Sequence, residues 1–236
     1  MTVKIFVPGH TVVRHPDGMF APSGLYQEIV YTDPPRAFPF RRTGLASAES
    51  EPDGPTSYLG GGTCVVDAAA TLYRAVADSG RAVSLCMIGG RSDYLVAVAP
   101  DREDLTEAVV MRDHAARILP PGVHIEAVGH TRTTEDDIQA VLEDVDRHGI
   151  ARAFVVMMAF RLARAEAILQ RAVIGWPEAE VSAERIVFVP AEALLPDVAA
   201  YLRLNGSAAH SRTMTNERFG IRKMLLGQSA TTGGRT

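Results

Sequence analysis

A glutamate near the middle of the chain has two possible roles. Glu107 ends the stretch 104–107, which reads DLTE. A carboxylate at this position can act as a general acid or base, or can position a ligand. The same spacing forms a capping box, in which the glutamate only holds the start of a helix. The residues alone leave both roles open.

A second acidic group follows a threonine-rich stretch. Thr134 and Asp137 have the spacing of a helix start, with acidic residues near the positive end of the helix dipole. Thr131, Thr134 and Asp137 are equally candidate ligand contacts. A metal site at Asp136 and Asp137 would need oxygen ligands from other loops, and no adjacent residue supplies them. We therefore predict no metal.

Two arginines stand one helical turn apart. Arg161 and Arg164 are three positions apart at an expected helix start, so they share one face. A guanidinium pairs well with phosphate or carboxylate, and the pair therefore predicts an anion clamp. A salt bridge from Arg164 to one of the acidic helix starts is the structural alternative.

Histidines and glycines complete the set of candidates. His10 and His130 each follow an expected strand and are candidate acid–base groups, although a lone histidine in a turn is more often simply hydrogen-bonded. Gly61 and Gly62 end a GGG run ahead of an expected helix. Their N–H groups can bind an anion, or the run can be a flexible entry to the helix. Cys64 and Cys86 fit small core residues.

Strand-like and helix-like stretches alternate along most of the chain and must position these groups. Strands are expected at 3–7, 83–88, 123–128, 153–158 and 186–189, and helices at 65–77, 105–119, 136–147, 162–173 and 197–202. Each expected strand is a continuous apolar run, as in a parallel sheet with both faces covered. The sequence therefore predicts an α/β fold with a doubly wound, mostly parallel, Rossmann-like sheet and helices on both faces.

In such a sheet, ligands bind beyond the carboxyl ends of the strands. The candidates that directly follow expected strands are Gly9, His10, Gly89, Gly90, Arg91, His130, Thr131 and Arg161. Glycine at these exits suits a close approach of the backbone to a ligand, although turns also favour it.

Two segments fall outside this alternation. Residues 11–57 hold seven of the 14 prolines, which argues against a long helix or a central strand there. We expect a lid-like insertion over the crevice with a short strand near 26–31; alternatively, its aromatic residues belong to the core or to a subunit interface. Residues 205–236 are expected to form a basic tail with a short helix after a single domain, 1–204.

Composition limits the partners. The net charge is −4 and the sequence pI is about 6.0, which argues against a nucleic-acid surface. No apolar run approaches the roughly 20 residues needed to cross a bilayer. We expect a cytoplasmic protein that binds a small anionic molecule and can form a homo-oligomer, and the sequence names no cofactor.

Several motifs resemble those of the YdcF/SanA/ElyC family. They are the glycine pair 89–90, TEA at 106–108 with Met111, the pair 122–123, TRTT at 131–134 before the two aspartates, and RLARA at 161–165. The resemblance covers about residues 60–175 and implies a Rossmann-like fold. The chain has Arg161 where that family has histidine, Thr131 where it has serine, and Asp136 and Asp137 where it tends to have Glu and Asn.

These observations suggest several functions. The first is an enzyme, a transferase or hydrolase, acting on a nucleotide-like or phosphorylated ligand with Glu107, His10 and His130 as candidate catalytic groups. The resemblance also implies links to nucleotide-type ligands and to envelope metabolism. The second is a non-catalytic ligand-binding or regulatory protein that keeps the pocket. In this case Arg161, in place of the family's histidine, has removed the family's chemistry. The third is an S-adenosylmethionine-binding protein, which is weakened because no acidic residue ends the second strand.

Overall fold

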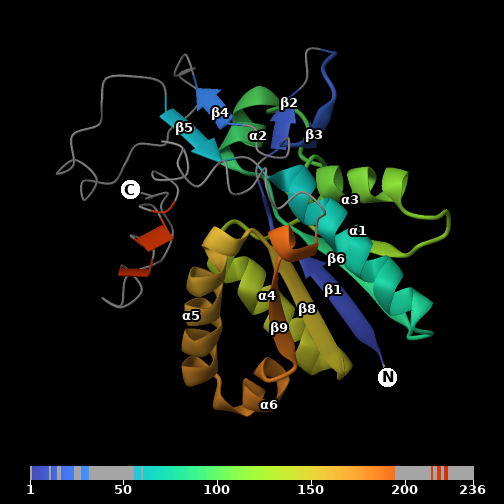
Figure 1. Ribbon diagram of the computed structural model, residues 1–236. Helices are drawn as coiled ribbons and strands as arrows, with labels where there is room; N and C mark the ends of the chain where they lie inside the picture. Colours follow the sequence, from blue (N-terminus) through green and yellow to red (C-terminus); the bar gives the residue numbers. More distant parts are fainter. Residues whose placement is uncertain are drawn as a thin grey trace.

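The computed structural model describes residues 2–10, 12–14, 17–23, 28–31, 56–59 and 61–194, together with 214, 217–218 and 221–222. Five parallel strands form the central sheet in the order β7-β6-β1-β8-β9 (Figure 1). They are β1 (Val3–Val7), β6 (Val83–Ile88), β7 (Ile125–Val128), β8 (Arg152–Met157) and β9 (Ile186–Pro190).

Helices cover both faces of this sheet (Figure 1). On one face, α1 (Gly62–Asp78) and α3 (Glu107–Ile118) pack on Ile5 and Val7. On the other, α4 (Thr134–His148) and α5 (Ala159–Gly175) pack on Phe6. Successive residues of β1 thus enter different cores, and all five are buried. The doubly wound α/β fold is confirmed, and burial on both faces explains why the strands are mostly apolar and do not alternate.

The chain reverses direction across the sheet next to β1. From β1 it proceeds outward to β6 and β7, and then α4 carries it back to β8 and β9 on the other side of β1. The helices change face at this reversal, which opens a crevice at the carboxyl ends of the strands.

Helix boundaries differ from the expected ones because of capping threonines. Helix α3 begins at Glu107 because the Thr106 side chain accepts a hydrogen bond from the Val109 N–H. Helix α4 begins at Thr134 because the Thr133 side chain accepts one from the Asp136 N–H. The apolar pattern alone does not mark such starts. The expected helix at 197–202 lies outside the described residues.

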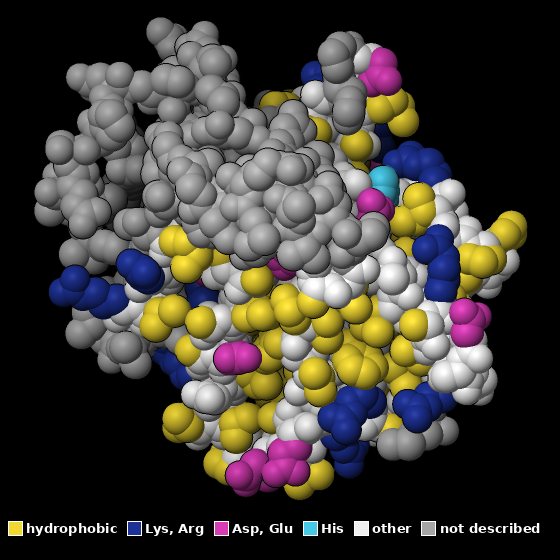
Figure 2. Space-filling view, in the orientation of Figure 1, with side chains coloured by type: hydrophobic (Ala, Val, Ile, Leu, Met, Phe, Trp, Pro, Cys, Tyr) yellow, Lys and Arg dark blue, Asp and Glu magenta, His cyan; other side chains and the backbone are white. Residues whose placement is uncertain are grey.

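Some short elements were not expected from the pattern. They are α2 (Asp93–Val98), α6 (Glu180–Ala183) and the 3-10 turns Pro177–Ala179 and Ala191–Leu194. Apolar side chains gather in the middle of the face shown in Figure 2. The partly buried Phe154 of β8 and Val189 of β9 pack on the core that α1 and α3 share.

The described parts of the proline-rich segment form two antiparallel strand pairs, and none of these described strands joins the central sheet. They are β2 (Val12–Arg14) with β3 (Phe20–Pro22), and β4 (Glu28–Tyr31) with β5 (Thr56–Leu59). Figure 1 places both at the carboxyl end of the sheet. The first packs Val12 and Phe20 into a small core with α2 and α3. Most of this segment, including residues 32–55, lies outside the described residues, so its role as a lid stays a prediction.

None of the helices among the described residues has the length and apolar character needed to span a bilayer.

Candidate functional site

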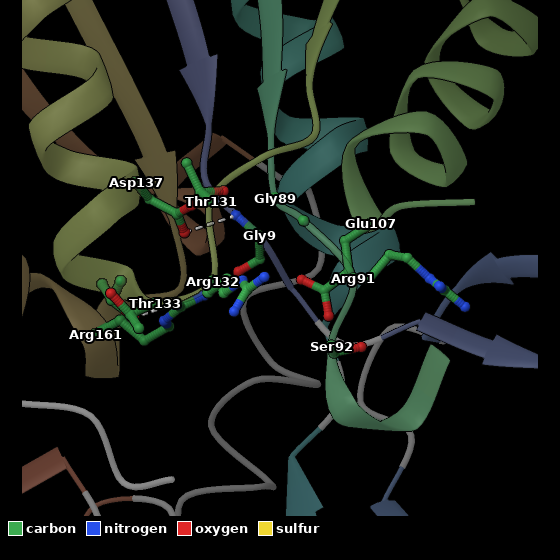
Figure 3. Close-up of a pocket in the computed structure, with 12 residues that line it drawn as sticks. Gly9, Gly89, Arg91, Ser92, Glu107, Thr131, Arg132, Thr133, Asp137 and Arg161 are labelled. Atoms are coloured by element: carbon green, nitrogen blue, oxygen red, sulfur yellow. Dashed lines mark hydrogen bonds between the residues drawn. The ribbon is translucent and has the colours of Figure 1, made fainter. Parts of the chain in front are cut away.

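A pocket of about 140 Å³ lies at the carboxyl edge of the sheet (Figure 3). Its lining comes from the exits of β1, β6 and β7 and from the starts of α3, α4 and α5, and consists of Gly9, Gly89, Gly90, Arg91, Ser92, Glu107, Thr131, Arg132, Thr133, Thr134, Asp137 and Arg161. Nine of these were candidate residues in the sequence; Ser92, Arg132 and Thr133 were not.

The pocket depends on glycines at two strand exits. A Cβ atom on Gly9 would lie 2.7 Å from Oε2 of Glu107 and 3.2 Å from the Cα of Gly89. Gly89 itself has a φ of 153°, which side-chain-bearing residues rarely adopt. The exits of β1 and β6 are therefore in direct backbone contact, and a carboxylate lies over them.

Glu107 is fixed by the backbone of the β6 exit. The N–H groups of Glu107 and Ala108 each donate to a carbonyl of the glycine pair, Gly90 and Gly89, at 2.9 Å. Because Thr106 caps α3, Glu107 is the first helical residue and does not occupy the capping-box position. Its carboxylate points instead into the pocket (Figure 3).

The environment of Glu107 favours its neutral form. Burial raises the pKa of Glu107 to about 8, and the nearby negative charge of Asp137 acts in the same direction. Ser92 and Arg161 oppose the shift only in part. The side chain is thus mostly protonated at neutral pH.

Asp137 enters the pocket from the first turns of α4. Other side chains cap the start of α4: the Thr133 hydroxyl accepts a hydrogen bond from the Asp136 N–H, and the Asp136 carboxylate accepts one from the Arg132 N–H at 2.9 Å. This arrangement leaves Asp137 free to accept the Gly9 N–H at 3.2 Å. Burial raises the pKa of Asp137 to about 6, although Arg161 and the Gly9 N–H favour its charged form.

Arg161 ties three elements together at the pocket. From the first turn of α5, its Nη1 donates to the Gly9 carbonyl at 2.7 Å and its Nη2 to the Thr134 hydroxyl at 3.1 Å. The guanidinium lies opposite Glu107 in Figure 3. Arg91, by contrast, turns away and donates to the Ala99 carbonyl at 2.6 Å.

The pocket can therefore support proton transfer beside a fixed positive charge. The carboxylates of Glu107 and Asp137 both lie close to Gly9. A Cβ atom added to Gly9 would lie 2.7 Å from Oε2 of Glu107 and 3.5 Å from Oδ2 of Asp137. Their pKa values of about 8 and about 6 bracket neutral pH. One group can supply a proton while the other accepts one.

Five candidates from the sequence lie elsewhere. His10 is 6% exposed, and burial, aided by Arg161, lowers its pKa to about 3. His130 is exposed on a second hollow beside α4. The N–H groups of Gly61 and Gly62 both donate to the Ser23 hydroxyl, at 3.1 and 3.0 Å. Arg164 forms an ion pair with Glu217 at 3.3 Å.

The three pocket residues that were not candidates follow or precede ones that were. Ser92 comes directly after Arg91, and Arg132 and Thr133 lie between Thr131 and Thr134. Their position close to the ends of expected strands was the one sequence feature that could have identified them. In the described part of the chain, no three His, Cys, Asp or Glu side chains are grouped as a metal site would need.

Comparisons with protein-family models, with curated proteins and with solved structures found no match to this chain.

Proposed function

We propose that this protein is an enzyme that transfers or hydrolyses a phosphoryl or related group on a small anionic, nucleotide-like or phosphorylated substrate. The observation that carries the proposal is the convergence of Glu107, Asp137 and Arg161 in one pocket at the chain-reversal point of the sheet. Ligands of open parallel sheets bind at this point.

Each of the three side chains has a distinct role in this proposal. Glu107 acts as the general acid, because a carboxyl group with a pKa of about 8 holds a proton at neutral pH. Asp137 acts as the general base that accepts a proton from water or from an acceptor hydroxyl. Arg161 binds an anionic oxygen of the substrate through a charge-assisted hydrogen bond.

The size of the pocket bears on the substrate. A volume of about 140 Å³ is below the roughly 300 Å³ at which pockets for whole drug-sized ligands begin. The pocket therefore suits the reacting anionic group, with the rest of the substrate extending beyond it. The resemblance to the YdcF/SanA/ElyC family supports a nucleotide-type substrate, with Arg161 in place of histidine as the main departure.

A pH profile on a panel of nucleotides and sugar phosphates tests the proposal. We expect kcat/KM of the active substrate to rise as pH passes about 6 and to fall as it passes about 8, because Asp137 must be charged and Glu107 protonated. Glu107→Gln and Asp137→Asn should each lower kcat by about 100-fold or more. Glu103→Gln, at an exposed site just before α3, is the control and should leave kcat unchanged.

Two outcomes would contradict the proposal. Full activity of Glu107→Gln would remove the acid from the mechanism. Binding of an anion that depends on Arg161, without turnover of any member of the panel, would favour the non-catalytic binding protein instead.

A further inference from the structure

A buried ion pair joins α5 to a residue close to the end of the chain. Arg164 is 8% exposed and Glu217 is 9% exposed, and Nη1 of Arg164 lies 3.3 Å from Oε1 of Glu217. The two residues are 53 positions apart. A carboxylate of this chain thus reaches the arginine that follows Arg161 by one helical turn.

Arg164 lies one helical turn from a residue that lines the pocket. It shares a face of α5 with Arg161, which lines the pocket, and the positive charge of Arg161 adds to burial in lowering the pKa of Arg164. An anion bound near two neighbouring guanidinium groups relieves their mutual repulsion, so the spacing of these arginines favours anion binding.

Among the described residues, the carboxylate of Glu217 has only one hydrogen-bond partner, and that bond is long. Charge-assisted hydrogen bonds between guanidinium and carboxylate are usually about 2.7–2.9 Å long, and this one is 3.3 Å. The other oxygen, Oε2, is buried and has no hydrogen-bond partner among the described residues. Such a contact can be exchanged for a better-matched anion at small cost.

We propose that Glu217 is an internal substitute for an anionic group of the substrate. A phosphate or carboxylate group of the ligand binds between Arg161 and Arg164 and displaces Glu217 from α5. The exchange keeps an anionic group beside Arg164, because one anion leaves as another arrives, so the buried guanidinium keeps an anionic partner throughout. This inference rests on the proposed function in one respect, namely that the pocket takes an anionic ligand.

Calorimetric titration of the full chain with inorganic pyrophosphate tests the displacement. We expect Glu217→Gln to bind pyrophosphate on the order of tenfold more tightly than the wild type, as for a site that an internal group occupies about nine-tenths of the time. Adding Arg164→Gln to Glu217→Gln should abolish that gain. Glu166→Gln, an exposed charge on the same helix, is the control and should leave the affinity unchanged.

The outcomes separate this inference from the proposed function. If Arg161→Gln weakens pyrophosphate binding but Glu217→Gln does not strengthen it, the pocket binds anions and the displacement is refuted. If Arg161→Gln has no effect on binding, the anion site itself is refuted. If neither the wild type nor Glu217→Gln binds pyrophosphate, both ideas fail.

Proteolysis of the wild type gives a readout that needs no variant. Arg218 is exposed and adjacent to Glu217. Displacement of Glu217 should therefore make the peptide bond after Arg218 more accessible to trypsin. We expect saturating pyrophosphate to increase the rate of cleavage after Arg218 several-fold, and not after the distant, exposed Arg81, as measured by mass spectrometry. An unchanged or slower cleavage after Arg218 would show that the pair is a fixed structural contact.

Discussion

At the scale of single residues, Glu107 and Asp137 differ because their surroundings differ. Both are carboxyl groups beside Gly9, and burial raises the pKa of each. Asp137 accepts a backbone N–H, which stabilises its charge, whereas Glu107 lies next to the charge of Asp137. The division into acid and base therefore comes from hydrogen bonds and neighbours.

The raised pKa of Glu107 predicts a pH dependence of stability. Between the ordinary value of 4.5 and about 8, the folded protein keeps a proton that the unfolded chain has lost. The free energy of unfolding contributed by this group is thus full below pH 4.5 and falls as pH rises through about 8. Because glutamine does not titrate, the stability of Glu107→Gln should not fall with pH for this reason.

We expect Glu107→Gln to melt within about 1 °C of the wild type at pH 5 and at least about 3 °C above it at pH 9. For a protein of this size, a change of about 1 kcal/mol in stability shifts Tm by 2–4 °C. Thermal melts at the two pH values measure the difference. A variant that is less stable than the wild type at pH 9 would mean that Glu107 supports the fold as an ion.

The sequence identified Arg161 because it follows an expected strand, and it identified Glu107 and Asp137 because they lie at expected helix starts. Position along a parallel sheet decides which of these residues meet. The sequence did not settle whether Glu107 caps α3, since Asp104 and Thr106 both precede it and both can cap. The choice of Thr106 depends on the Gly89 and Gly90 carbonyls, which come from another segment of the chain. Contacts between distant segments leave no pattern in the neighbouring sequence, so the sequence could not predict this choice.

At the scale of elements, the exit of β6 must lie against the exit of β7. A Cβ on Gly90 would overlap the carbonyl oxygen of Thr131, and Gly90 also accepts the Glu107 N–H. The glycine pair therefore positions the starts of both α3 and α4. An added methyl group would push these elements apart.

Gly90→Ala should destabilise the protein by about 3 kcal/mol or more, because a backbone atom must move to relieve the overlap. Pyrophosphate affinity should fall as well. Gly175→Ala is the matched control, since a Cβ there meets nothing within 4 Å, and should be neutral or slightly stabilising. Chemical denaturation of both variants measures the difference, and equal stabilities would show that the two exits are loosely packed.

The ranges of the elements were largely predictable, because the period of the apolar residues is local. The expected strands at 3–7 and 83–88 are found at those residues, and the short strand expected near 26–31 is found as β4 at Glu28–Tyr31. Helix α2 was missed because its six residues are too few to show a period. The pairing of β2 with β3 was missed because prolines mask a strand pattern.

At the scale of the whole molecule, strand order was the feature that the sequence left open. Alternating strands and helices are compatible with many orders, and the one observed puts β1 at the centre. A polar residue marks this centre. Lys4 is 6% exposed in β1, and its Nζ lies 2.6 Å from Oε2 of Glu126 on β7 and 2.9 Å from Oδ2 of Asp144 on α4.

Lys4 therefore links the central strand to an edge strand and to the helix that covers them. Burial tends to lower the pKa of Lys4, yet the hydrogen bonds to Glu126 and Asp144 raise it above the usual 10.5. A raised lysine pKa means that the stabilisation is fully present below 10.5 and is lost only as pH rises through the folded value. The ion pair should contribute equally at pH 6 and pH 9.

We expect Lys4→Met to lower the free energy of unfolding by about 2 kcal/mol at both pH values. This is less than the 3–5 kcal/mol for a fully buried pair, because Glu126 and Asp144 keep partial access to water and can be solvated when the lysine is gone. Arg112→Met breaks the exposed pair with Asp113 and is the control, with an expected change below about 0.5 kcal/mol. Urea unfolding at the two pH values measures both variants. A loss for Lys4→Met that appears only at pH 6, or a gain in stability from better apolar packing beside Phe6, would show that this charge does not hold the layers together.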